Sequence, residues 1–206
     1  INLTKYKIIN CHAGKLPFYR GRNVLNWVLI NDQKEFGITV HYVDEGIDTG
    51  DILAQQTFPI TDEDNYETLL ERAYSGCTEL LYKTVKQLMD GKAVGRQQAE
   101  IHPFGFYCTG RKEGDERLNW DQSSRDIFNF VRAICRPGPE ARTFCEDVEI
   151  KINWAELLSN APIFKGIPGA VLGTSSDGFL VKTQDSYLKV VEWNGPDRIR
   201  IGDRLK

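Results

Sequence analysis

The stretch "NCHAGKLPFYRG", residues 10–21, places an Asn and a His two positions apart at the end of a short apolar run. A loop with Pro and Gly follows at once. Side chains two positions apart on a strand point to the same face, so an extended run would point Asn10 and His12 together. In α/β sheets ligands bind at the carboxyl ends of strands, although a lone Asn and His pair is also typical of a capped turn.

A second stretch, "GITVHYVDEGIDTGDIL" at residues 37–53, joins a β-rich run to an acidic loop, which we expect at the same kind of strand edge. Most acidic loops are simply solvated. One carboxylate in contact with His12 would orient its imidazole and stabilise the protonated form. An Asn amide, a His and an Asp suit acyl transfer to an amine, because they can stabilise an oxyanion and manage a proton. The sequence has no apparent Ser or Cys nucleophile elbow, which favours direct transfer.

The apolar spacing predicts an α/β chain of alternating strands and helices. Helical spacing covers residues 23–31, and β-rich runs cover residues 36–43 and 52–60. A capping pattern at Asp64 and Glu67 then begins the clearest helix, which carries a long apolar stripe.

The character of the sequence changes near residue 107, where a polar, turn-rich segment indicates a domain entry. Ser123 and Asp126 repeat the capping pattern before a short amphipathic helix, which "RPGPEA" stops. Short β-like runs then alternate with turns and predict a small β-barrel or an open β-domain. We therefore expect two domains, residues 1–107 and residues 108–206.

Composition excludes several classes of protein. No apolar run approaches the roughly 18 residues of a membrane span. Five dispersed Cys residues indicate reduced cytoplasmic thiols, with neither a disulfide framework nor a metal site. The formal net charge of −3 argues against a dedicated nucleic-acid binder. We expect a cytoplasmic protein with no membrane partner and with homo-oligomerisation left open.

Together the two stretches resemble the 10-formyltetrahydrofolate-dependent formyltransferases, which carry Asn-x-His in the first segment and a loop Asp in the second. The resemblance implies Asn10, His12 and Asp48 as catalytic residues. The segment "GRKEGDERLNWDQSSRDIFNFVRAICRPGPEARTF" is similar to the start of the family's C-terminal, OB-like domain. The implied fold is α/β: a partial Rossmann-like domain at 1–107, followed by a small OB-like β-barrel at 108–206.

The first half of the family's Rossmann-like domain is missing from this chain. We therefore expect the native protein to be longer by several strands and helices. The first residues of the chain should lie beside an unpaired strand edge, or leave one face of the sheet uncovered.

The family mechanism implies that a substrate amine attacks the formyl carbon carried on a folate nitrogen. Asn10 and His12 would stabilise the tetrahedral oxyanion, while Asp48 holds His12 in its working state. His12 or a bound water would accept the proton of the amine.

The same resemblance places the pterin ring of the cosubstrate, 10-formyltetrahydrofolate, against the acidic loop. The implied binding residues are Val43, Asp44, Gly46 and Ile47. Gly46 and Gly50 agree with partial recognition through the backbone, because glycine allows close approach.

Three classes of acceptor compete. Glycinamide ribonucleotide enzymes share the "VDEG" loop but usually lack a C-terminal β-domain. Methionyl-tRNA enzymes have that domain but typically read "SLLP" where this chain has "GKLP". A polyanion favours a basic face, whereas residues 101–206 contain 15 Lys plus Arg and 15 Asp plus Glu. The loop and the segment "RGRNVLNWVLIN" look closer to enzymes that formylate nucleotide-linked amino-deoxysugars, as in lipopolysaccharide O-antigen biosynthesis. We expect such an acceptor, with tRNA second.

Lys15, Tyr19 and Arg20 are the predicted acceptor-binding residues. An Arg fork suits a phosphate, but Arg20 could equally pair with the acidic loop. His41, in the middle of a predicted strand, is interpreted as a structural residue.

Two further interpretations remain open: a formyl-folate hydrolase, which would use water in place of the amine, and a non-catalytic binding module. The intact set of Asn10, His12 and Asp48 argues against the binding module. Free formate as product would identify a hydrolase, and a formamide would identify a transferase.

Overall fold

The computed structural model describes residues 7–196 and 198–206, which divide into two compact units. The first unit consists of three segments, namely the residues up to Val28, Gln33–Asp64 and Thr68–Arg111. The second consists of Leu29–Asp32, Asn65–Glu67 and Lys112–Lys206.

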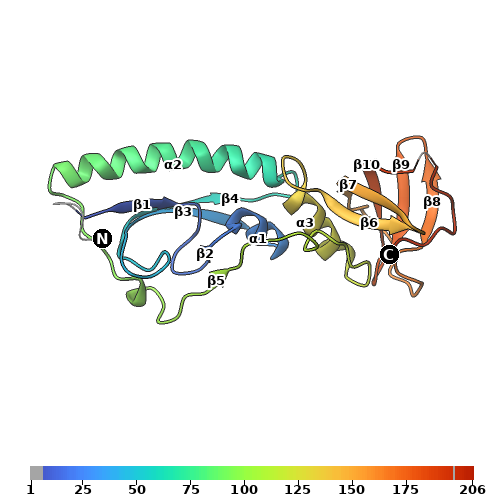
Figure 1. Cartoon of the computed structure of the whole chain (residues 1–206), viewed down its shortest axis with the longest axis horizontal. Coiled ribbons are helices and arrows are strands. Elements are labelled where there is room, and N and C mark those ends of the chain that lie inside the picture. Colours follow the sequence, from blue (N-terminus) through green and yellow to red (C-terminus); the bar gives the residue numbers. More distant parts are fainter. Residues whose placement is uncertain (1–6, 197) are drawn as a thin grey trace. The chain divides into compact units, whose positions relative to one another are not determined.

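The first unit contains a three-stranded sheet, a two-stranded parallel ribbon and most of two α-helices (Figure 1). Its strands are β1 (Ile9–His12), β2 (Arg20–Gly21), β3 (Glu35–Tyr42), β4 (Ile52–Pro59) and β5 (Tyr107–Cys108). Its helices are α1 (Val24–Ile30), α2 (Tyr66–Met89) and the short 3-10 helix η1 (Gln98–Glu100). The helix predicted at residues 23–31 and the strands predicted at 36–43 and 52–60 are confirmed within one residue at each end.

The sheet has the order β1-β3-β4, and β3 pairs antiparallel with both neighbours. The expectation that β1 and β3 end at the same edge of a sheet is therefore wrong. The loop after β3 starts opposite the beginning of β1 and folds back so that Asp48 reaches Asn10 and His12. Among the described residues β1 pairs only with β3, so the unpaired strand edge expected at the start of the chain is present.

Alternation along β3 separates two faces of this sheet. Phe36, Ile38 and Val40 on one face are at most 1% exposed. Thr39 and His41 on the opposite face are polar and yet at most 2% exposed. An apolar face and a polar face therefore share one strand.

Helix α2 covers the apolar face (Figure 1). A Cβ added at Gly76 would lie 2.6 Å from Cδ1 of Ile38 and 2.8 Å from Cζ of Phe58, so the helix backbone approaches the sheet closely. On the same face the Cys11 thiol donates to the backbone carbonyl of Cys77 at 3.7 Å. Asn10 and His12, which alternate with Cys11 along β1, consequently face away from the helix.

The second unit contains a five-stranded antiparallel sheet and one α-helix. The sheet order is β6-β7-β10-β9-β8. Its elements are α3 (Ser124–Ile134), β6 (Ala141–Cys145), β7 (Val148–Glu156), β8 (Val171–Ser175), β9 (Gly178–Lys182) and β10 (Tyr187–Asn194). Ser123 caps α3 by accepting a hydrogen bond from the backbone N–H of Asp126, as the capping pattern predicts.

The last residues of the chain connect the two edges of this sheet. Lys206 exchanges backbone hydrogen bonds with Phe144 of β6, and the N–H of Val171 in β8 donates to the carbonyl of Asp203. Both edge strands are thereby paired, which is the closure expected of a small β-barrel. No helix in the described part of the chain is both long enough and apolar enough to cross a membrane.

Candidate active site

The polar face of the first sheet carries the Asn and the His of the opening motif. In the β1–β3 register Asn10 lies opposite His41, and His12 lies opposite Thr39. Directly opposed residues share a face, so these four side chains point to the same side.

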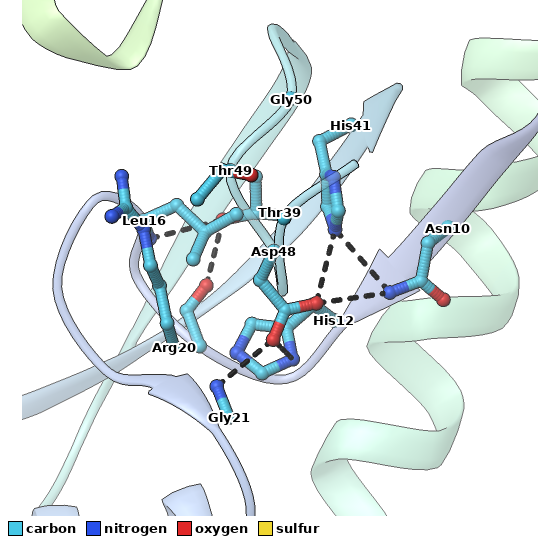
Figure 2. A network of polar contacts seen from close by, with 12 residues as sticks. Asn10, His12, Leu16, Arg20, Gly21, Thr39, His41, Asp48, Thr49 and Gly50 are labelled. Atoms are coloured by element: carbon cyan, nitrogen blue, oxygen red, sulfur yellow. Dashed lines mark hydrogen bonds and ion pairs between the residues drawn. The ribbon is translucent and has the colours of Figure 1, made fainter. Parts of the chain in front are cut away.

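Asp48 reaches this group from the loop after β3 (Figure 2). Its Oδ2 lies 3.6 Å from Nδ1 of His12, and its Oδ1 accepts from Nδ2 of Asn10 at 3.4 Å. Oδ1 also lies 3.5 Å from Nε2 of His41, and the backbone N–H of Gly21 donates to Oδ2 at 2.9 Å. The structure thus brings together the three residues predicted to be catalytic in one polar cluster, in which Asn10 is exposed and His12 and Asp48 are partly buried.

The carboxyl of Asp48 is ionised at neutral pH. Burial by itself would raise its pKa, but the hydrogen bond from His41, the N–H of Gly21 and the charge of His12 outweigh that effect and hold the pKa at about 2. The backbone of Asp48 has a φ of 54°, a left-handed conformation that a non-glycine residue keeps only when its surroundings enforce it.

His12 is held at both of its ring nitrogens. Nε2 lies 2.7 Å from the backbone carbonyl of Tyr19, and Nδ1 faces Asp48. The carbonyl of Tyr19 can only accept, so Nε2 donates to it, whereas the separation of 3.6 Å between Nδ1 and Oδ2 of Asp48 is longer than a hydrogen bond. A Cβ at Gly14 would lie 2.4 Å from Nε2, so only glycine leaves room for the ring in this position.

The sequence interpretation missed the contacts of His41. Its Nδ1 donates to the carbonyl of Tyr42 at 2.8 Å, and its Nε2 lies 3.3 Å from Nδ2 of Asn10 and 3.5 Å from Oδ1 of Asp48. The ring thereby orients the Asn10 amide and also faces Asp48. The antiparallel register, which puts His41 beside Asn10, is the signal that could have identified it.

The predicted acceptor-binding residues occupy different surroundings. Lys15 forms an ion pair with Glu35 at the start of β3, and both side chains are nearly half exposed. Tyr19 is buried and gives its carbonyl to His12. The guanidinium of Arg20 donates to Gln98, so its partner is a neutral amide instead of a carboxylate of the acidic loop.

The predicted folate-binding loop, residues 43–48, is held by hydrogen bonds to its own Asp44 side chain and by close packing of the backbone that follows it. Oδ1 of Asp44 accepts from the N–H of Gly46 at 3.1 Å and from the hydroxyl of Thr49 at 2.5 Å. Ile47 is 65% exposed and presents an apolar side chain next to Asp48 in the chain. A Cβ at Gly50 would lie 1.9 Å from the carbonyl oxygen of Tyr42, so the close approach at Gly50 is made by the protein's own backbone.

Residues 1–85 match the formyl transferase family, and residues 111–202 match the formyl transferase C-terminal domain. The chain belongs to the formyltransferase family. The two matches account for most of the sequence and leave the segment between them, residues 86–110, unassigned.

Relatives among curated proteins bear the name methionyl-tRNA formyltransferase. The chain is 36% identical over 192 residues to that of Thermodesulfovibrio yellowstonii, which covers 93% of this chain and 59% of the relative. It is 38% identical over 196 residues to the methionyl-tRNA formyltransferase of Halothermothrix orenii. That match covers 93% of this chain and 61% of the relative. The chain thus spans about three fifths of the length of these curated relatives.

Solved structures show the same fold. The N-formyltransferase from Helicobacter canadensis in complex with folinic acid and dTDP-3-aminofucose has a TM-score of 0.71 at 23% identity, over 91% of this chain and 66% of that one. HypX from Aquifex aeolicus has a TM-score of 0.67 at 22% identity, over 92% of this chain and 33% of that one. At such identities the likeness concerns the fold.

Proposed function

We propose that the protein transfers a formyl group from 10-formyltetrahydrofolate to a primary amine. The observation that carries the proposal is the convergence of Asn10, His12 and the ionised Asp48 on one face of the sheet. Family membership supports the reaction class, and the cluster supplies the chemistry for it.

Each residue of the cluster has a role in this reaction. Asn10 and His12 supply N–H donors for the negative charge that develops on the formyl oxygen. The contacts of Nδ2 of Asn10 with Asp48 and His41 measure 3.4 and 3.3 Å, which is long for hydrogen bonds. An incoming oxygen can therefore compete for those protons.

Asp48 stabilises the protonated form of His12 through its ionised carboxylate. The amine forms a bond to the formyl carbon and loses one proton, while the bond from that carbon to the folate nitrogen breaks and that nitrogen gains one. The cluster of His12 and Asp48 is placed to carry this proton. The products are a formamide and tetrahydrofolate.

For the acceptor we propose an amino-deoxysugar linked to a nucleotide. The balanced charge of residues 101–206 supports a small acceptor over a long polyanion. Arg20 supports it as well, because a neutral partner leaves its guanidinium fully charged for a phosphate.

Initiator methionyl-tRNA is the second candidate, and a specific observation favours it. Curated relatives with 36% and 38% identity bear the name of that activity.

Product analysis with the full-length protein tests both proposals. The protein is incubated with 10-formyltetrahydrofolate and either a panel of nucleotide-linked aminosugars or charged initiator tRNA. We expect a formamide on a sugar, and an affinity for that sugar that changes only modestly with salt. Formylated tRNA, bound with a steep salt dependence, would replace the sugar as acceptor. Free formate alone would identify a hydrolase, and no product would contradict the transfer.

A further inference from the structure

Gln98, the first residue of η1, is a buried polar side chain outside the cluster that the proposed reaction uses. It is 4% exposed. Its Oε1 accepts from Nε of Arg20 at 3.1 Å and from Nη2 of Arg20 at 2.6 Å. Its Nε2 donates to the carbonyls of Asp48 and Gly50, both at 2.8 Å. The side-chain amide of Gln98 therefore uses both of its N–H donors and its oxygen in hydrogen bonds.

The two carbonyls belong to the turn that aims the catalytic carboxylate. Asp48 has a left-handed backbone, and Gly50 packs directly against the carbonyl of Tyr42. Gln98 holds this turn from the main-chain side, while the side chain of Asp48 extends to His12 and the N–H of Gly21. Because the main chain sets the origin of the side chain, the amide of Gln98 helps to fix the direction of the carboxylate.

The other end of Gln98 orients Arg20. An amide oxygen carries no net charge, so it fixes the guanidinium without neutralising it. The ring of Tyr107, which is paired with Arg20 in the β2–β5 ribbon, lies 5.5 Å from the guanidinium carbon. A Glu in the place of Gln98 would hold the same cation but would cancel its charge.

We propose that Gln98 is a positioning residue that fixes the Asp48 turn and the Arg20 cation with one side chain, and so couples the proton-handling group to the anchor for the acceptor phosphate. This inference rests on the proposed formyl transfer. It adds a residue from the segment between the two family matches.

The decisive variants are Gln98→Leu, Arg20→Met and the double variant of the full-length protein. We expect Arg20→Met to raise the acceptor KM about tenfold with little change in kcat, because it removes uniform binding. We expect Gln98→Leu to raise the acceptor KM about tenfold and to lower kcat about tenfold, because it also releases the Asp48 turn.

The double variant separates positioning from general destabilisation. It should show the acceptor KM of Arg20→Met and the kcat of Gln98→Leu, because an absent Arg20 cannot be misplaced further. An additive rise of the acceptor KM to about a hundredfold would overturn the coupling. Thr84→Val is the control. It removes a buried hydroxyl of α2 that donates to the carbonyl of Leu80, and it should leave kcat and the acceptor KM unchanged.

A titration of Asp48 by NMR keeps the test independent of catalysis. In Gln98→Leu the pKa of Asp48 should rise from about 2 toward its ordinary value as the carboxylate leaves its donors. Gln98→Glu provides a second variant of the same shape, which should likewise lower kcat and raise the acceptor KM. A wild-type protein that forms no formamide contradicts the proposed function, whereas an unchanged Asp48 pKa in both variants contradicts the role of Gln98.

Discussion

Two carboxylates, one in each unit, are stabilised in their ionised form by different sets of partners. Asp185 in the second unit accepts from the N–H of Ser124 at 2.8 Å, the hydroxyl of Ser124 at 3.1 Å and the hydroxyl of Thr183 at 3.0 Å. Burial opposes its ionisation, but these bonds outweigh it and lower the pKa. The pKa of Asp48 in the first unit is also lowered, by His41, the N–H of Gly21 and His12.

The difference lies in what the partners can do. The donors around Asp185 are hydroxyls and a helix N-terminal N–H, which do not ionise near neutral pH, so the carboxylate caps α3 and stabilises it. The partners of Asp48 include two imidazoles, the side chain that most often acts as a general acid or base. A lowered pKa by itself therefore does not distinguish structure from catalysis, whereas the chemistry of the partners does.

Replacing each carboxylate by its amide gives the largest contrast. Asp48→Asn should reduce kcat about a thousandfold, because His12 loses the charge that supports its protonated form. The amide oxygen can still accept from the N–H of Gly21, so the fold should persist. Steady-state formyl transfer and thermal unfolding measure the two effects.

Asp185→Asn is the matched control. It should change kcat by no more than about twofold while lowering the free energy of unfolding by about 1 kcal/mol through a weaker helix cap. A loss of less than about tenfold in Asp48→Asn, or an equal loss in Asp185→Asn, would remove the functional distinction between the two carboxylates.

The sequence predicts those parts of the first unit that depend on local pattern. Alternation and helical spacing of apolar residues predict α1, β3 and β4, because the apolar face of each element is formed by residues close together in the sequence. The convergence of Asn10, His12 and Asp48 follows from the resemblance of two motifs. The reason first given for it, a shared strand edge, fails because β1 and β3 are antiparallel.

The remaining site residues depend on contacts that no local pattern encodes. His41 joins the cluster only through its register with Asn10, 31 residues away. Gln98 reaches Asp48 across 50 residues from a segment with no regular apolar spacing. Sequence periodicity describes faces of single elements, whereas these contacts require the path of the loops in space.

A methyl group at Gly50 should give the next largest effect. Its Cβ would lie 1.9 Å from the carbonyl oxygen of Tyr42, a backbone atom that cannot rotate away. We expect Gly50→Ala to lower the free energy of unfolding by about 3 kcal/mol. Gly173→Ala in β8 is the control, because its Cβ would meet only the flexible side chain of Leu180, with Cδ1 at 3.4 Å and Cγ at 3.8 Å. Chemical denaturation measures both, and equal losses would contradict the close packing of the Asp48 turn.

Acid should remove a defined part of the stability of the first unit. The pKa of Asp48 is about 2 in the folded protein, below the ordinary value of about 3.9 for an unfolded chain. A lowered folded pKa contributes stability that is fully present above the unfolded value and is lost as the pH falls through the folded value. The free energy difference between wild type and Asp48→Asn should therefore shrink by about 2 kcal/mol from about pH 6 to about pH 2.

The exposed Asp177 provides the control for this titration. Its pKa is lowered by the Lys189 ammonium and by Ser175, but its side chain is 70% exposed, so solvent screens these contacts. The difference between wild type and Asp177→Asn should change far less over the same pH range. A constant difference for Asp48→Asn would contradict the ionised, enclosed carboxylate.

Lys15 gives the smallest expected effect and tests the acceptor directly. Its ion pair with Glu35 is nearly half exposed on both sides, and such pairs contribute about 0–1 kcal/mol to stability. Lys15→Leu should therefore leave unfolding almost unchanged, as should Lys83→Leu, which breaks the exposed pair of Lys83 with Glu79 on α2. If Lys15 contacts a nucleotide-linked sugar, only Lys15→Leu should raise the sugar KM, by several-fold. The KM of the formyl-folate should stay the same, because we expect that ligand to bind the Val43–Asp48 loop. Identical sugar kinetics in the two Lys variants would place Lys15 with the structural ion pairs and would move the acceptor-binding role to Arg20.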